Sequence, residues 1–131
     1  MKISFDLHGV LDDAPETMKF IMESIIKNGG EVHIITGSTE EKAKKELKEL
    51  GFNRYIHFTD VVGLPDYLLG KGKEVISYHP FLNNPEFSDL DWDSAKAQYC
   101  SENNVNLHFD DTLRYGDYFK TPFARLWTKD K

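Results

Sequence analysis

Apolar runs that fit buried strands recur along the chain, and amphipathic segments lie between them. Residues 2–7 are rich in apolar side chains and end beside a carboxylate, which predicts a buried first strand. Residues 31–36, with Val-His-Ile-Ile at their centre, predict a second strand. Further strands are expected over residues 55–59, 74–78, 105–109 and 123–127.

The segments between these runs predict helices. The first helix has apolar residues at helical spacing, namely Met18, Ile21, Met22, Ile25 and Ile26. Asp13 is its expected N-cap, with Glu16 completing a capping box and Pro15 in the first turn. Ser38 and Glu41 repeat the capping-box spacing before a second, highly charged helix. A short helix is expected near residues 65–69 and a longer one over residues 93–103.

Strands that alternate with helices predict an α/β sandwich with a mainly parallel sheet. The length of 131 residues fits a single domain over residues 1–131. Residues 60–93 are the least regular stretch, because three prolines interrupt any periodic pattern. We interpret this stretch as a small insert rather than as a second core.

The composition excludes several classes of protein. A single cysteine, Cys100, excludes an internal disulfide framework and a cysteine-rich zinc module. The 16 basic and 22 acidic residues give a net charge of −6, which argues against a dedicated nucleic-acid binder and leaves a nucleotide substrate open. No apolar run is long enough for a signal peptide or a membrane span, so we expect a soluble, cytoplasmic protein without a membrane partner.

Reactive side chains gather at the ends of the predicted strands. Asp6 ends the first strand, Thr36 ends the second, and the pair Asp110-Asp111 follows a late one. Ligands bind outside the carboxyl ends of parallel strands, so these groups are expected to meet. Converging carboxylates repel each other, and Mg²⁺, which prefers oxygen ligands, would relieve that repulsion. The Thr36 hydroxyl, backbone N–H groups at the start of the second helix, and Lys96 could then hold a phosphate.

These positions resemble the four motifs of the haloacid dehalogenase superfamily. Residues 5–10, Phe-Asp-Leu-His-Gly-Val, are similar to the first motif, Asp-x-Asp-Gly followed by Thr or Val. Residues 34–37 are similar to the second motif and residues 107–111 to the fourth, and all occur in the family's order. Lys96 is the best match to the lysine of the third motif, and the competing candidates are Lys71 and Lys73. The resemblance covers residues 2–111.

The resemblance implies a fold, a reaction and a role for each residue. The expected fold is a three-layer Rossmann-like sandwich, and the expected reaction is Mg²⁺-dependent hydrolysis of a phosphomonoester through an aspartyl-phosphate. Asp6 would be the nucleophile and a Mg²⁺ ligand, and His8 would offer its backbone carbonyl to the ion. Asp110 would bind Mg²⁺ directly, and Asp111 would bind it through water or orient Lys96. The phosphoryl group would be bound by Thr36, Gly37 and Lys96.

His8 departs from the family pattern, in which phosphatases have a second aspartate that acts as general acid and base. Histidine can transfer protons near neutral pH, so His8 could serve in the same role. The alternative is a catalytically impaired member that keeps metal and phosphate binding or acts as a regulator. A response-regulator receiver is a third interpretation, disfavoured because receivers have their acidic pair after the first strand, whereas this pair follows Phe109.

The substrate is left open by these motifs. The first helix begins almost directly after the first motif, which leaves no room there for a large cap, and residues 60–93 could cover the site only in part. A small-molecule or otherwise accessible phosphate ester is therefore expected. The acidic composition disfavours nucleic acid as a partner, and no pattern indicates an oligomeric state.

Overall fold

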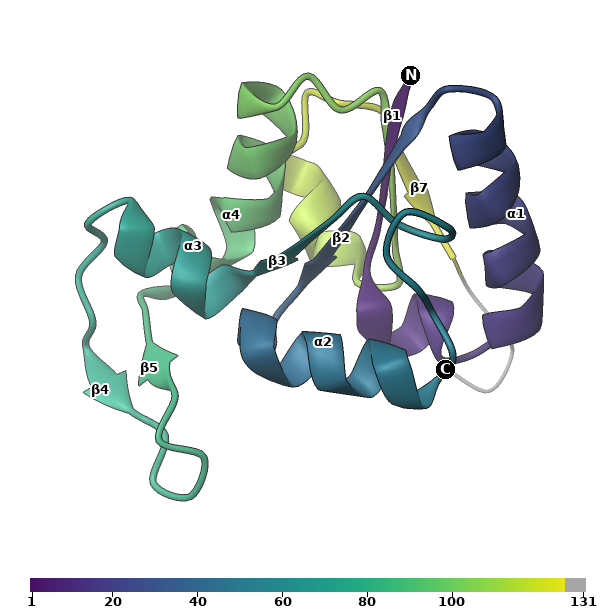
Figure 1. Ribbon diagram of the computed structural model, residues 1–131. Helices are drawn as coiled ribbons and strands as arrows, with labels where there is room; N and C mark the ends of the chain where they lie inside the picture. Colours follow the sequence, from purple (N-terminus) through teal and green to yellow (C-terminus); the bar gives the residue numbers. More distant parts are fainter. Residues whose placement is uncertain (127–131) are drawn as a thin grey trace.

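The computed structural model describes residues 1–126 and has an α/β architecture built on a five-stranded sheet (Figure 1). All four neighbouring strand pairs are parallel. Across the sheet the strands follow the order β3 (Asp60–Gly63), β2 (Glu31–Thr36), β1 (Lys2–Phe5), β6 (Leu107–Asp110) and β7 (Phe123–Arg125). The expected α/β class and three-layer Rossmann-like sandwich are confirmed.

Helices cover both faces of the sheet because successive strand residues point to opposite sides. Val32 and Ile34 of β2 belong to one apolar cluster, and Ile35 belongs to the other. The first cluster lies under α1 (Pro15–Lys27) and α2 (Glu40–Glu49), and the second under α3 (Leu64–Gly70) and α4 (Asp89–Glu102). No helix of the described part of the chain is both long and apolar enough to cross a membrane.

Two short helical turns and a hairpin complete the fold. The turn η1 (Leu7–Leu11) follows β1, and η2 (Leu113–Tyr118) lies between β6 and β7. The antiparallel hairpin of β4 (Ser77–Tyr78) and β5 (Pro85–Glu86) projects from the body at the lower left of Figure 1. The irregular insert is therefore shorter than residues 60–93, because β3 and α3 belong to the core and α4 begins before residue 93.

The predicted strand over residues 55–59 is wrong. This segment reverses direction: the Tyr55 N–H donates to the Phe58 carbonyl at 2.6 Å, and Tyr55 has a φ of 69°. The third strand begins only at Asp60. The final strand was expected to reach residue 127, which lies outside the described residues, and it is observed over Phe123–Arg125.

The helix caps differ from prediction by one or a few residues. Thr39, rather than Ser38, caps α2 by accepting a hydrogen bond from the Lys42 N–H. Ala14 is at the N-cap position of α1 and forms no side-chain cap bond, so the predicted role of Asp13 is wrong, although Pro15 does begin the helix. The late helix starts at Asp89 rather than at residue 93, because the hydroxyl of Ser88 caps it.

Candidate functional site

The candidate site lies where the strand order changes direction. The chain passes from β1 outward through β2 and β3 and then crosses to the other side of β1 to form β6 and β7. Asp6 directly follows β1, and Asp110 is the last residue of the neighbouring β6. The Asp6 N–H donates to the carbonyl of Phe109 at 2.9 Å, which holds the two strand ends together. This is the switch point at which open parallel sheets bind ligands.

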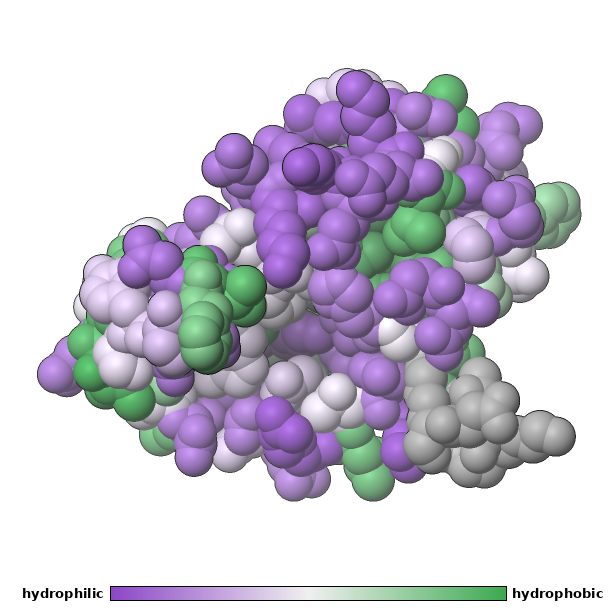
Figure 2. Space-filling model, turned by 90° about the horizontal axis from the view of Figure 1, so that it is seen from below, coloured by the Kyte–Doolittle hydropathy of each residue, from purple (hydrophilic) through white to green (hydrophobic). Residues whose placement is uncertain are grey.

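Figure 2 shows this end of the molecule, with hydrophilic residues in purple around a hollow beside the projecting hairpin lobe. One carboxylate oxygen each from Asp6, Asp110 and Asp111 lie within 4.8 Å of one another at the carboxyl ends of β1 and β6. The structure thus brings together carboxylates from both ends of the chain.

Lys96 joins two of these carboxylates. Its Nζ is 2.7 Å from Asp110 Oδ2 and 3.0 Å from Asp6 Oδ1, and its side chain is 3% exposed. The ring of Tyr115 lies 5.1 Å from the same Nζ. The competing lysines lie elsewhere, since Lys71 pairs with Glu102 and Lys73 with Asp91. Of the three candidate lysines, only Lys96 therefore contacts the carboxylates.

The carboxylate of Asp110 is held by donors on both oxygens. Oδ2 accepts from His108 Nε2 at 2.9 Å as well as from Lys96, and Oδ1 accepts from the Thr112 N–H at 3.1 Å. On the other side of the ring, His108 Nδ1 lies 2.7 Å from the hydroxyl of Ser4. Because Nε2 donates to a carboxylate, the Ser4 hydroxyl donates to Nδ1, and a neutral imidazole fits this chain.

Asp6 has a more open arrangement than Asp110. Its Oδ1 accepts from the Leu7 N–H at 2.9 Å and contacts Lys96. Within residues 1–126, every fully buried side-chain nitrogen or oxygen atom has a hydrogen-bond partner. The other oxygen of Asp6, Oδ2, accepts no hydrogen bond from these residues, so it is not fully buried. Oδ2 therefore has access to solvent, as an attacking oxygen would need.

Burial and charge move the pKa values of the cluster in different directions. Burial raises the pKa of Asp6 to about 7, against the opposing effect of Lys96 and with a contribution from Asp110. Burial also opposes the ionised form of Asp110, but the hydrogen bond from His108 and the charge of Lys96 outweigh it and hold that pKa well below its usual range. Burial lowers the pKa of Lys96, and Asp6 and Asp110 together raise it by more. Burial lowers the pKa of His108 despite its bond to Asp110. Because a single lysine faces three carboxylates, the cluster has an excess of negative charge when these are ionised.

The raised pKa of Asp6 predicts how the stability of the metal-free protein depends on pH. Asp6 has an ordinary pKa of 3.8 and a folded-state pKa of about 7, so its stabilising contribution is complete below 3.8 and is lost as pH rises through about 7. Asp6→Asn should therefore increase the free energy of unfolding at pH 8, by up to about 4 kcal/mol, and change it little at pH 4. Urea unfolding with a chelator present measures both values, and an equal difference at the two pH values would contradict the assignment.

Asp111 approaches the backbone of Gly9 in the turn η1. Gly9 has a φ of +84°, and a Cβ atom there would lie 2.1 Å from Asp111 Oδ2. The turn after β1 therefore needs glycine at this position both for its backbone conformation and for the close approach of a carboxylate.

Gly9→Ala is expected to destabilise the fold more than Gly29→Ala. Gly29 has a similar φ of +83°, but a Cβ there would meet no atom within 4 Å. Gly29→Ala should cost roughly 1 kcal/mol for the backbone alone, and Gly9→Ala roughly 1–3 kcal/mol more because Asp111 must move. Urea midpoints of the two variants test this comparison, and equal losses would show that the contact with Asp111 is not restrictive.

The side chain of His8 does not join the carboxylate cluster. Its Nε2 lies 2.6 Å from Glu46 Oε2 of α2, and the side chain is 51% exposed. The group of possible ligands around Asp6 does not include it. Sequence reasoning missed Glu46 because α2 reads as a solvated charged helix.

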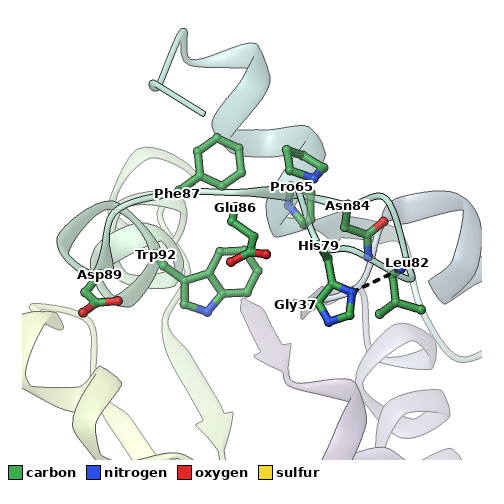
Figure 3. Close-up of a pocket in the computed structure, with 10 residues that line it drawn as sticks. Gly37, Pro65, His79, Leu82, Asn84, Glu86, Phe87, Asp89 and Trp92 are labelled. Atoms are coloured by element: carbon green, nitrogen blue, oxygen red, sulfur yellow. Dashed lines mark hydrogen bonds between the residues drawn. The ribbon is translucent and has the colours of Figure 1, made fainter. Parts of the chain in front are cut away.

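Thr36 ends β2 at the same edge of the sheet, and Gly37 directly follows it. Thr36 is fully buried, and its hydroxyl accepts from the Ser38 N–H at 3.3 Å. The parallel pairing of β1 with β2 sets Thr36 level with the residue that follows Asp6. Gly37 lines a pocket formed with the hairpin insert (Figure 3).

The start of α2 is less suited to phosphate than expected. The Glu40 N–H donates to Asp66 Oδ2 at 2.7 Å, and the Lys42 N–H donates to Thr39. These two first-turn donors already have protein acceptors. A phosphate at this edge would therefore depend on Thr36 and on the lysine of α4.

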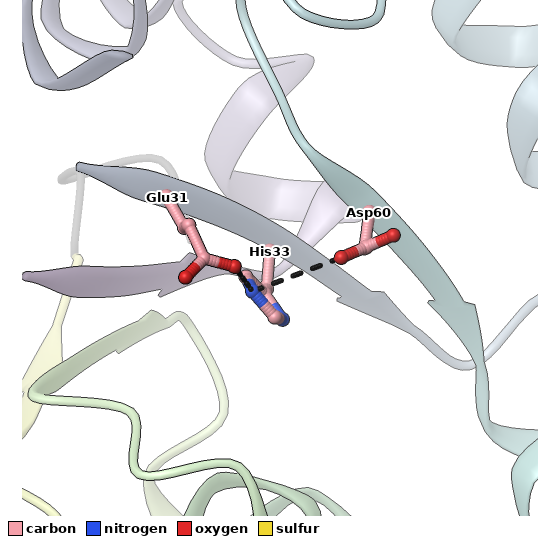
Figure 4. A group of neighbouring side chains, drawn as sticks. All are labelled: Glu31, His33 and Asp60. Atoms are coloured by element: carbon pink, nitrogen blue, oxygen red, sulfur yellow. Dashed lines mark hydrogen bonds and ion pairs between the residues drawn. The ribbon is translucent and has the colours of Figure 1, made fainter. Parts of the chain in front are cut away.

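A second cluster of potential ligands is Glu31, His33 and Asp60 (Figure 4). His33 Nε2 lies 3.3 Å from Glu31 and 3.9 Å from Asp60, and its Nδ1 lies 2.6 Å from the Tyr99 hydroxyl. Glu31 and Asp60 also pair with Lys2 and Arg54, respectively. Since each group has a protein partner and the cluster lies toward the amino ends of the strands, we interpret it as structural.

Two further residues near the site, His108 and Tyr115, were also not identified from the sequence. His108 precedes Asp110 by two positions in one strand, so the strand period alone places both on the same face. That signal was available in the sequence. Tyr115 had no comparable signal, because it lies in the short helical turn η2 and reaches Lys96 only through tertiary packing.

Comparisons of the chain with protein-family models, with curated proteins and with solved structures gave no match. The residues and geometry of this chain are therefore the basis for assigning its function.

Proposed function

We propose that the protein is a Mg²⁺-dependent phosphohydrolase of the haloacid dehalogenase type that acts on a phosphomonoester through Asp6. The observation that carries this proposal is the convergence of Asp6, Asp110 and Asp111 within 4.8 Å around a buried lysine. The cluster lies at the switch point of a parallel sheet, where ligands bind.

The donor set of the cluster fits a hard divalent cation. Asp6, Asp110 and Asp111 offer carboxylate oxygens, which Mg²⁺ prefers, and the excess negative charge of the cluster favours binding of a cation. These three residues, with the backbone carbonyl of His8, would hold the ion. When bound, Mg²⁺ would supply positive charge that offsets the charge of a phosphoryl group.

Asp6 would act as the nucleophile through Oδ2. That oxygen attacks phosphorus, a new O–P bond forms as the ester P–O bond breaks, and the leaving alkoxide takes a proton. A water molecule then attacks the phosphorus of the aspartyl-phosphate, which restores the Asp6 carboxylate and releases inorganic phosphate. Thr36 and Lys96 would hold the phosphoryl oxygens during both steps.

His8 would act as general acid in the first of these steps and as general base in the second. Its Nε2 is engaged by Glu46 at 2.6 Å, so Nδ1 is the atom that would protonate the leaving alkoxide and later accept the proton of the water. Glu46 orients the ring in this arrangement, much as a carboxylate orients the histidine of other acid–base pairs.

Release of phosphate from p-nitrophenyl phosphate tests the proposed function. We expect turnover with Mg²⁺ and none with EDTA. His8→Ala should lower kcat by roughly a hundredfold or more, and His8→Asp should retain more activity than His8→Ala. A wild-type protein that turns over no phosphate ester from a broad panel would contradict the proposal.

The position of His8 favours a second candidate, a protein that binds metal and phosphate without turnover. Its imidazole is half exposed and pairs with Glu46 rather than with the carboxylate cluster. This candidate predicts Mg²⁺ binding by calorimetry without hydrolysis, and turnover only after His8→Asp. Hydrolysis by the wild-type protein would exclude it.

A further inference from the structure

The hairpin insert forms a pocket of about 270 Å³ with the first turn of α4 and the end of β2. Figure 3 shows Trp92 and Phe87 on one side of it and His79 and Asn84 on the other. This volume lies near the lower end of the range for ligand pockets, which suits one ring system rather than an extended polymer.

Two residues of the pocket are neighbours of proposed phosphate-binding residues. Gly37 directly follows Thr36 at the end of β2. Trp92 precedes Lys96 by one turn of α4, so these two residues lie on the same face of the helix. The indole lies against Gly37, since a Cβ atom there would be 3.1 Å from Trp92 Cζ2. The pocket therefore begins where the candidate site ends.

The ten residues that line the pocket include no lysine or arginine. Its charged members are acidic, Glu86 and Asp89. A second phosphate or a carboxylate would be repelled by these two carboxylates, whereas an uncharged group would not be repelled and an amino group could donate hydrogen bonds to them. The partly buried ring of Trp92 offers a surface against which a planar group can stack.

The polar groups of the pocket can form hydrogen bonds with the edge of a nitrogen heterocycle. His79 Nδ1 accepts hydrogen bonds from the N–H groups of Phe81 and Leu82 at 3.2 and 3.1 Å. The ring proton is therefore on Nε2, which is a donor. The amide of Asn84 supplies a donor and an acceptor, and the carboxylate of Glu86 accepts from amino groups.

We propose that this pocket binds the nucleobase of a nucleoside monophosphate whose phosphate lies at Asp6. The inference rests on the proposed function, because it assigns the leaving group of that reaction. The hairpin insert would thus select the substrate, and Trp92 would provide the stacking surface.

Phosphate release from adenosine 5′-monophosphate and from ribose 5-phosphate tests the assignment, because the two esters differ only in the base. We expect kcat/KM to be roughly ten- to a hundredfold higher for the nucleotide, the range typical of base stacking on an aromatic ring. Trp92→Ala should remove this preference, and Trp92→Phe should retain most of it. Phe20→Ala, which removes an exposed aromatic ring of α1, should leave the preference unchanged. Equal values for the two esters in the wild-type protein would overturn the proposal.

A binding measurement decides the same question if the protein releases no phosphate. The sequence has two tryptophans, Trp92 and Trp127, so Trp127→Phe leaves the pocket indole as the sole tryptophan fluorophore. Saturable quenching by adenosine, and none by ribose, would support the base pocket even though the proposed function had failed. Absence of quenching by adenosine and by its monophosphate would overturn the pocket assignment, whatever the activity.

Discussion

Asp6→Asn is expected to abolish Mg²⁺-dependent phosphate release, with kcat falling on the order of a thousandfold or more. An amide has no negatively charged oxygen with which to attack phosphorus, so the covalent intermediate cannot form. The amide oxygen can still accept the hydrogen bond from the Leu7 N–H that the wild-type Oδ1 accepts. The variant should therefore remain folded. Phosphate release from p-nitrophenyl phosphate at saturating Mg²⁺ measures the effect.

Asp60→Asn is the matched control for this variant. It makes the same chemical change at the amino end of the sheet, in the cluster with Glu31 and His33. We expect full activity from Asp60→Asn. Full activity from Asp6→Asn would instead show that another group attacks phosphorus, and equal loss in both variants would indicate a general effect on folding.

Lys96→Met is expected to destabilise the metal-free protein by roughly 3–5 kcal/mol at pH 8, since it leaves buried carboxylates without their cation. Asp110 is fully buried and Asp6 nearly so, and both contact Lys96. Without the lysine their folded-state pKa values should rise. A carboxylate whose pKa is higher in the folded than in the unfolded state destabilises the folded protein as the pH rises above its unfolded-state pKa. The loss of stability should therefore be larger at pH 8 than at pH 5. Urea unfolding of both proteins at the two pH values measures it.

Lys71→Met is the corresponding control on the surface. Lys71 pairs with Glu102, and both side chains are more than one-third exposed. Solvent screens such a pair, so its loss should cost less than about 1 kcal/mol at either pH. If Lys96→Met were as mild as Lys71→Met, the carboxylate cluster would not depend on a buried cation, and the electrostatic account of the site would be wrong.

The elements that the sequence predicted well have strong local signals at both ends. The limits of β2 were predicted correctly, because its apolar run lies between glycines before and after it. The strand expected over residues 55–59 failed, since aromatic and β-branched residues suit a strand but do not report whether the backbone reverses. The Tyr55 N–H closes a turn onto Phe58 instead of pairing with a neighbouring strand.

The candidate site, like the fold, was predicted in part from the sequence. The placement of Asp6, Thr36 and the Asp110-Asp111 pair at strand ends followed from the alternation of strands and helices, because parallel strands end at a common edge. The sequence did not distinguish Lys96 from Lys71 and Lys73. The choice depends on how α4 packs across the sheet, which brings one lysine to the carboxylates and leaves the others with Glu102 and Asp91.

The sequence by itself determined the α/β class and the chemical groups available at the carboxyl edge, because both follow from periodicity and order along the chain. Only the tertiary structure decided that the His8 side chain pairs with Glu46 and that the hairpin insert encloses a pocket beside Gly37. These contacts join residues far apart in the chain. Their distances depend on packing between whole elements, which local patterns do not encode.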